Sequence, residues 1–134
     1  MSSGTAVEDS CVTAFKELAT RKVNTVLYRL SDDFSAIVPD SKGTMTYEDF
    51  VKALPENEPR YAIHDYEFAT TDGRKTSKIV LFSWVPESSP IKHKMVYASS
   101  KSTLRATLSG IAVEIQATDP GDLDREEVDA RVIL

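Results

Sequence analysis

The stretch KIVLFSWV at residues 78–85 decides the fold, because six of its eight residues are apolar and they run almost without interruption. A strand of this composition is typical of the centre of a sheet that is covered on both faces. A second strand is expected at residues 61–68, and a hairpin loop at residues 71–75 joins the two, with Asp72-Gly73 as its turn. The sequence therefore predicts two central strands with further elements packed on either side.

The remaining elements follow from apolar periodicity and turn residues. Helices are expected at residues 7–21, 46–54, 90–109 and 122–131, and further strands at residues 24–30, 36–38 and 112–117. Residues 40–43 are expected to form a turn. Residues 95–97 alone favour a strand by propensity, but the longer pattern around them favours a helix. This order predicts an α/β fold with a central mixed sheet of about five strands, flanked by helices on both faces.

Length and composition narrow the class of protein. The 134 residues suit one domain over residues 1–134, in which we expect residues 1–6 to be a flexible N-terminal segment. The single cysteine, Cys11, excludes an internal disulfide and a cysteine-built metal site, and no apolar run approaches the roughly 20 residues of a membrane span. With two distant histidines and no glycine-rich phosphate loop, the sequence predicts no catalytic residues, no cofactor and no metal.

Charge is distributed unevenly along the chain, whose formal net charge is −5. Residues 60–105 hold 8 basic and 4 acidic side chains, whereas the segments before and after them are net acidic. No acid occurs between Ser88 and Val113, although this stretch carries several cations. A nucleic-acid binder usually has a broad positive field, which this chain lacks. The pattern favours one basic patch directed at one acidic partner. The cations of the stretch are Lys92, Lys94, Lys101 and Arg105.

The expected helix at residues 90–109 has two different faces when its residues are placed at about 100° intervals. One face is an apolar stripe that we expect to join the core, formed by Val96, Tyr97, Leu104, Leu108 and Ile111. The opposite face is a cationic ridge, formed by Lys94, Ala98, Lys101 and Arg105, with Ile91, Met95 and Ser102 beside it.

A cationic ridge is most often a solvated helix face, but two features of this one favour a protein interface. No acid lies four residues away along the helix, so we expect the ridge not to be neutralised. Ile91 and Met95 also flank it, and apolar anchors among steering charges suit a protein partner. Met95 could equally be a core residue, and the pattern alone leaves both readings open.

Five segments match one known family: LPEN at 54–57, RYAIHDYEF at 60–68, SKIV at 77–80, KMVYASSK at 94–101 and EIQATDP at 114–120. Together they resemble the actin-depolymerising factor/cofilin family, whose domain is the ADF-homology domain, from about residue 3 to residue 131. The KMVYASSK stretch is the most specific of them. The resemblance implies a mixed sheet of about five strands between helices, in agreement with the expected element order.

The resemblance also implies an activity and partners. Members of the family are not enzymes: they bind ADP-actin monomers and filaments and promote filament severing and depolymerisation. The implied partner is actin in its ADP form, with phosphoinositides competing at the basic helix. Neither nucleic acid nor stable membrane insertion is expected, and the protein is expected to be a monomer. It is expected in the cytoplasm at the actin cytoskeleton, and the resemblance leaves open whether it also enters the nucleus.

Carried over residue by residue, the resemblance implies two actin-binding surfaces. Ser3 also matches the serine whose phosphorylation inactivates many relatives, and a phosphate there would add about −1.5 to −2 charge beside the cationic helix. The implied monomer-binding residues are Ser3, Gly4, Lys92, Lys94, Met95, Lys101 and Arg105, and the implied filament-binding residues are Arg74, Lys75, Lys78 and Arg131.

Two departures from the family pattern define an alternative. Ala106 stands where the family often has a second basic residue, and the chain stops at Leu134, earlier than many relatives do. The alternative is a monomer-sequestering or weakly severing interaction module on the same fold.

Overall fold

A long antiparallel hairpin forms the centre of the sheet, as the apolar stretch predicts. The computed structural model describes residues 5–133, and in it the hairpin consists of β4 (Arg60–Ala69) and β5 (Lys75–Trp84). The two strands pair along their whole length, from Arg60 opposite Trp84 to Ala69 opposite Lys75. Gly73 takes a positive φ of 86° in the connecting turn, which a glycine adopts without strain.

Four further strands complete a six-stranded mixed sheet in the described part of the chain. They are β1 (Ala6–Val7), β2 (Thr25–Leu30), β3 (Ala36–Gly43) and β6 (Val113–Ala117). The strand order is β1-β3-β2-β4-β5-β6. The outer pairs β1–β3 and β5–β6 are parallel and the others antiparallel, so the predicted mixed sheet is confirmed.

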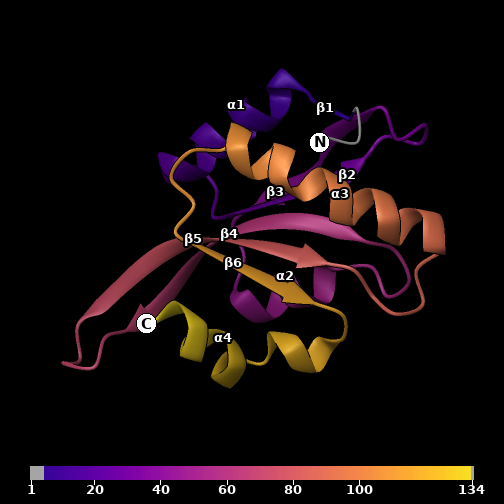
Figure 1. Cartoon of the computed structure of the whole chain (residues 1–134). Helices are drawn as coiled ribbons and strands as arrows, with labels where there is room; N and C mark the ends of the chain where they lie inside the picture. Colours follow the sequence, from indigo (N-terminus) through magenta and orange to yellow (C-terminus); the bar gives the residue numbers. More distant parts are fainter. Residues whose placement is uncertain (1–4, 134) are drawn as a thin grey trace.

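Helices cover both faces of the sheet, which confirms the predicted fold class. Figure 1 shows α1 (Asp9–Ala19) and α3 (Ile91–Thr107) on one face, and α2 (Tyr47–Ala53) and α4 (Arg125–Val132) on the other. A short 3-10 helix, η1 (Pro120–Leu123), precedes α4, so the single helix expected at residues 122–131 is divided at Asp124. Each side of the sheet has its own cluster of buried apolar side chains.

The sheet has one strand more than expected, because the first predicted helix begins too early. Residue 7 does not start a helix: Ala6 and Val7 pair with Ala36 and Ile37 of β3, and α1 begins at Asp9. Backbone hydrogen bonds hold the strand, from Ala6 N to Ser35 O at 2.9 Å and from Glu8 N to Ile37 O at 3.1 Å. The end of the segment expected to be flexible, residues 5 and 6, is therefore ordered against β3, while residues 1–4 lie outside the described part.

The prediction of a turn at residues 40–43 is wrong. These residues continue β3, since Ser41, Lys42 and Gly43 pair with Leu27, Val26 and Thr25 of β2. The register shifts between Leu27 and Tyr28, where β2 faces Pro39 of β3. Proline has no N–H to donate to a regular ladder, so within a sheet it is tolerated at an irregularity such as this, where the regular pairing is interrupted. Pairing between distant segments thus overrides the local turn chemistry.

The buried tyrosine hydroxyls on the α1/α3 side bind backbone groups. Tyr28 donates to the carbonyl of Cys11 at 3.0 Å, Tyr61 donates to the carbonyl of Tyr97, and the Tyr97 hydroxyl accepts from Leu30 N at 2.9 Å. Cys11 is fully buried, and burial raises the pKa of its thiol to about 11, as expected of a structural cysteine. Among the described residues, no helix has both the length and the apolar character that crossing a membrane requires.

Candidate functional site

The long helix α3 is anchored to the sheet by the predicted apolar stripe. Pro90 precedes its first residue, and Lys94 N donates to Pro90 O at 3.0 Å, closing the first turn. Tyr97, Leu104, Leu108 and Ile111 are buried in the cluster on this side, and Val96 packs against it. The opposite face of α3 therefore has a fixed orientation toward solvent.

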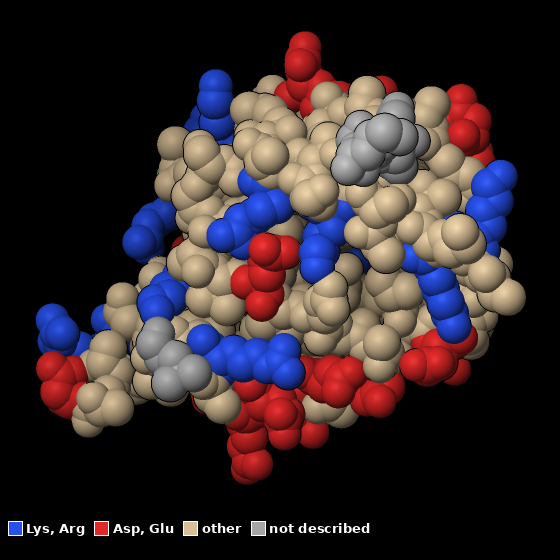
Figure 2. Space-filling view, viewed as in Figure 1, with Lys and Arg blue, Asp and Glu red and all other residues tan. Residues whose placement is uncertain are grey.

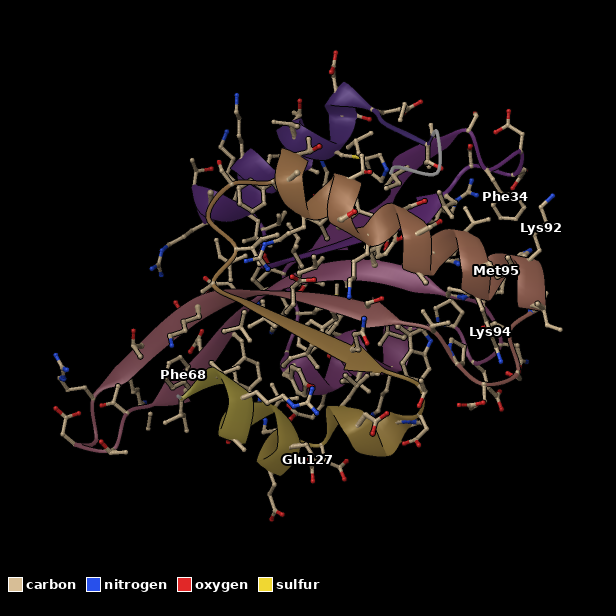
Figure 3. All side chains as sticks on the ribbon, viewed as in Figure 1. Phe34, Phe68, Lys92, Lys94, Met95 and Glu127 are labelled. Carbon is tan, nitrogen blue, oxygen red and sulfur yellow. The ribbon has the colours of Figure 1, made fainter. Side chains whose placement is uncertain are left out.

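That outward face carries exposed apolar side chains at the start of the helix. Ile91 is 77% exposed and Met95 is 66% exposed, and Ile133 is the one other large apolar residue of the described chain that is exposed. The structure thus decides between the two readings of Met95 in favour of the surface. Figure 3 shows Lys92, Lys94, Met95 and Phe34 gathered at the first turns of α3.

Each cation of α3 has a neighbour that holds it. Lys92 Nζ lies 5.1 Å from the ring centroid of Phe34, and Lys94 Nζ lies 4.0 Å from a carboxylate oxygen of Glu87. Further along the helix, two cations share one carboxylate, that of Glu114 on β6. We use the name α3 surface for the outward side chains of this helix, namely Ile91, Lys92, Lys94, Met95, Lys101 and Arg105.

The expectation that the ridge is not neutralised is wrong: Lys94 is paired with Glu87, and the two cations of its second half share Glu114. Arg105 lies 3.0 Å from Glu114 and Lys101 lies 3.8 Å from it, and Arg105 also donates to Ile111 O at 3.3 Å. No acid lies four residues away along the helix, but β6 runs beside it and supplies one. The pairs are partly exposed, so each contributes about 0–1 kcal/mol to stability. Figure 2 shows one acidic side chain between basic ones on this face, and further acidic side chains gathered below, over η1 and α4.

The predicted filament-binding residues lie elsewhere, around the hairpin and α4. Arg74 and Lys75 are exposed at the hairpin end, where Arg74 Nε lies 3.1 Å from Asp72. Lys78 is half-buried: its Nζ donates to Val132 O at 2.8 Å and lies 5.6 Å from the ring centroid of Phe68. Arg131 is exposed on α4. Figures 1 and 3 place this group at the end of the molecule opposite the start of α3.

Two of the predicted monomer-binding residues, Ser3 and Gly4, lie outside the described residues. The next residue, Thr5, is buried against α3, where Ser100 Oγ donates to Thr5 Oγ1 at 3.3 Å. The structure therefore brings Lys92, Lys94 and Met95 together at one end of α3 and joins Lys101 to Arg105 at the other.

Sequence reasoning missed three side chains that contact the α3 surface: Phe34, Glu87 and Glu114. Phe34 is a lone aromatic residue within the polar stretch SDDFS at residues 31–35, and Glu114 is an outward-pointing residue in an alternating strand. Each signal is visible in the sequence, but only the tertiary structure assigns the partner.

A cavity of about 660 Å³ on the other side of the sheet, between α2, β4 and α4, is lined by charged and aromatic groups. Arg125 lies over the rings of Tyr47 and Tyr66, at 5.0 and 5.6 Å, and donates to Glu48 at 2.7 Å. This hydrogen bond lowers the pKa of Glu48. Burial lowers the pKa of His64 to about 4, so its imidazole is neutral at neutral pH. Within residues 5–133, no group of three His, Cys, Asp or Glu could hold a metal ion.

Comparison with solved structures shows the class of protein that this fold defines. The crystal structure of Streptomyces griseoflavus cofilin superimposes with a TM-score of 0.86 and 37% sequence identity, covering 93% of this chain and 94% of that one. The structure of Plasmodium berghei actin depolymerization factor 2 gives a TM-score of 0.87 at 28% identity, covering 99% of each chain. The fold is therefore that of cofilin and actin depolymerization factor.

The sequence comparisons agree. Cofilin of Yarrowia lipolytica is 44% identical over 133 residues, which are 97% of this chain and 87% of that protein. The sequence model described as cofilin/tropomyosin-type actin-binding protein matches residues 4–133. The chain belongs to this family of actin-binding proteins, which confirms the resemblance drawn from its five segments.

Proposed function

We propose that this protein binds ADP-actin monomers and filaments and promotes filament severing and depolymerisation. The observation that carries the proposal is the start of α3, where Ile91 and Met95 are 77% and 66% exposed beside Lys92 and Lys94. A soluble fold has no internal reason to leave two large apolar side chains together in water. In a family of actin-binding proteins, this arrangement suits the contact with actin.

The α3 surface combines two kinds of contact. An apolar side chain that becomes buried on binding supplies affinity, and methionine adapts its shape to a partner's groove. Cations around it steer an acidic partner and fix its orientation. We assign monomer binding to Lys92, Lys94, Met95, Lys101 and Arg105, together with Ser3 and Gly4 of the N-terminal segment.

Filament binding requires a second surface, for which we propose Arg74, Lys75, Lys78 and Arg131. They lie at the opposite end of the molecule from the start of α3, so one copy could contact two neighbouring actin subunits. Binding changes the twist of a filament only as far as the protein prefers the twisted state. Severing would follow from that preference, and no catalytic step is involved.

One observation favours a second candidate, a monomer-sequestering or weakly severing module. Two of the four proposed filament-binding cations already have partners within the chain: Lys78 is bound to the Val132 carbonyl and Arg74 is paired with Asp72. The hairpin surface therefore offers fewer free charges than the number of its basic residues indicates. Weak filament contacts with intact monomer contacts would produce this behaviour.

Regulation by negative charge follows from the same surface. We propose that phosphoinositides compete with actin for the basic side chains of α3, and that phosphorylation of Ser3 adds negative charge near them. A protein of this activity would act in the cytoplasm at the actin cytoskeleton. We propose that it acts as a monomer. Imaging of the labelled protein in cells would show whether it also enters the nucleus.

Co-sedimentation with ADP-actin filaments, combined with imaging of single filaments, tests the proposal. Protein in the pellet together with fragmenting filaments is the expected result. Protein that stays in the supernatant while actin moves there too would favour the monomer-sequestering candidate. If actin is unaffected and no protein sediments, the proposed function is wrong.

A further inference from the structure

The turn between β2 and β3 places an aromatic ring against the first turn of α3. Phe34 has a positive φ of 61°, a region that bulky side chains rarely adopt. Its ring centroid lies 5.1 Å from that of His93, in a T-shaped arrangement with an interplanar angle of 80°. Lys92 Nζ lies 5.1 Å from the same ring centroid. Figure 3 shows Phe34 and Lys92 next to one another at the start of α3.

Local hydrogen bonds hold the turn in this conformation. Ser31 N donates to Ala36 O at 2.7 Å, and Phe34 N donates to Ser31 O at 2.8 Å. The Asp33 carboxylate accepts from Ser31 Oγ at 2.8 Å, from Ser35 N at 3.0 Å and from Ser35 Oγ at 2.7 Å. These bonds lower the pKa of Asp33 to about 2. The turn therefore imposes the unusual backbone of Phe34 and fixes the direction of its ring.

The same turn is attached to the first described residues of the chain. Thr5 Oγ1 donates to Phe34 O at 3.2 Å, and Ala6 N donates to Ser35 O at 2.9 Å. The backbone of the turn thus holds the N-terminal strand, while the Phe34 ring contacts Lys92 and His93 of α3. The turn therefore connects the N-terminal segment to α3, and we assign monomer binding to residues of both.

We propose that the β2–β3 turn belongs to the actin-monomer surface and that Phe34 is a positioning residue for Lys92. This inference rests on the proposed function. The face of an aromatic ring attracts an ammonium group, so the ring keeps the flexible Lys92 side chain close to Ile91 and Met95. Because Lys92 is already restricted, it loses less rotamer freedom when an acidic group of the partner pairs with it. Strained backbone of this kind tends to occur at functional sites.

The opposite end of the molecule provides a matched pair for comparison. Lys78 lies 5.6 Å from the ring centroid of Phe68, but it also donates to Val132 O. The carbonyl holds that ammonium, so the ring is not its only partner. Phe34→Leu and Phe68→Leu make the same chemical change at the two sites, and only the first affects a lysine of the α3 surface.

The test measures the affinity of the full chain for ADP-actin monomers at low ionic strength. We expect Phe34→Leu to weaken binding about 2- to 5-fold, the range of an exposed cation–π contact. Phe34→Tyr keeps an aromatic ring at this position and should bind with the affinity of the wild type. Phe68→Leu should leave monomer affinity unchanged. In a Lys92→Ala background, Phe34→Leu should cause no further loss, because the ring would act through Lys92. NMR of the Lys92 ε-methylene group should show an upfield ring-current shift that Phe34→Leu removes.

Three results would overturn the proposal. An equal loss from Phe34→Leu with and without Lys92 would show a structural role only. Unchanged monomer affinity of Phe34→Leu, while the wild type binds normally, would exclude the turn from the surface. Wild-type protein that does not bind monomers would remove the proposed function and this inference with it, an outcome that the wild-type measurement alone identifies.

Discussion

The two sides of the sheet use their charged and apolar side chains differently. On the α1/α3 side, the 17-residue helix α3 leaves Ile91 and Met95 in solvent beside Lys92 and Lys94. On the other side, α2 and α4 are only 7 and 8 residues long. Cations have partners within the chain on both sides, as Lys94 shows with Glu87 on the first side and Arg125 with Glu48 and two tyrosine rings on the second. The two sides therefore differ in the pair of exposed apolar side chains at the start of α3, and not in whether their cations have partners within the chain.

The buried polar groups of the two sides differ as well. Both sides bury tyrosine hydroxyls that donate to backbone carbonyls, Tyr28 on the α1/α3 side and Tyr47 on the α2/α4 side, but of the described histidines only His64, on the α2/α4 side, is buried. His64 is 3% exposed, lies parallel to the Phe50 ring at 5.1 Å, and has Nδ1 at 2.7 Å from Thr25 Oγ1. The single hydroxyl proton of Thr25 is donated to Asn24 Oδ1, so the Thr25 oxygen must accept the proton of His64 Nδ1–H. The neutral imidazole satisfies this arrangement. Protonation of His64 in acid should therefore destabilise the packing on the α2/α4 side.

The largest expected effect is the loss of stability in acid caused by His64. Burial lowers its pKa from 6.5 to about 4, so between these values the unfolded chain binds more protons than the native one. Stability contributed by the neutral imidazole is present above pH 6.5 and is lost as the pH falls toward 4. Since one pKa unit corresponds to about 1.4 kcal/mol, the loss by pH 4 is about 3 kcal/mol. Urea unfolding at a series of pH values measures it.

His64→Asn is the control for this prediction. Asparagine keeps an N–H that can donate to Thr25 but does not titrate, so the variant is less stable at pH 7 and less sensitive to pH between 6.5 and 4. Acidic groups elsewhere contribute equally to both proteins and cancel in the comparison. Parallel curves of unfolding free energy against pH for the two proteins would show that His64 does not cause the loss.

The second prediction concerns the apolar part of the α3 surface. Met95→Ala should weaken binding of ADP-actin monomers by about 2 kcal/mol, or roughly 30-fold, as expected for a central anchor of an interface. Since Met95 is 66% exposed, the free energy of unfolding should change by no more than about 0.5 kcal/mol. Titration of fluorescently labelled ADP-actin monomers gives the affinity, and urea unfolding gives the stability.

Ile133→Ala is the matched control, because Ile133 is also exposed, at 39%, but follows α4 on the other side. Its monomer affinity should equal that of the wild type. Equal losses in the two variants would mean that the difference between the two sides does not decide monomer binding.

A third prediction separates the two proposed surfaces. Lys75 is exposed at the hairpin end and has no ion pair within the described chain, so Lys75→Ala should remove a charge that is free to contact a filament. We expect filament affinity in co-sedimentation to fall about 3- to 5-fold, the effect of up to 1 kcal/mol, with monomer affinity unchanged. Lys92→Ala should lower both affinities. If Lys75→Ala lowers monomer affinity as much as filament affinity, the separation of the surfaces is wrong.

Periodicity in the sequence was sufficient to find the two faces of α3, because neighbours along one helix decide which side is buried. The apolar stretch at residues 78–85 identified the central strand for a similar reason. Strand β1 has two residues and depends on β3, so no local pattern reveals it. Residues 40–43 carry turn chemistry, and only their pairing with β2 makes them a strand.

In the candidate site, too, local sequence patterns did not reveal contacts between residues that are distant in the sequence. Met95 was left undecided by the pattern, since its exposure depends on what covers the start of α3. Phe34 and Glu114 were missed because each reaches α3 from another element of the fold. Local rules therefore identified the residues of the surface, whereas tertiary contacts decide which partner each of its charges has within the chain.

The smallest expected effect tests how Glu114 modifies the second half of the α3 surface. Its carboxylate lies 3.0 Å from Arg105 and 3.8 Å from Lys101, so it offsets part of the positive charge offered to an acidic partner. Glu114→Gln should raise affinity for ADP-actin monomers about 2- to 3-fold at low ionic strength, within the range of an exposed ion pair. The gain should disappear at high salt, which screens exposed charges.

Glu127→Gln is the control, because it changes the net charge equally but lies on α4, away from α3 (Figure 3). An equal gain in both variants would reflect the net charge of the molecule. A weaker affinity of Glu114→Gln would reverse the interpretation: Glu114 would then act mainly by holding Lys101 and Arg105 in the binding geometry, as we propose that the Phe34 ring does for Lys92. In that case both halves of α3 would be pre-organised, one by a carboxylate and the other by an aromatic ring.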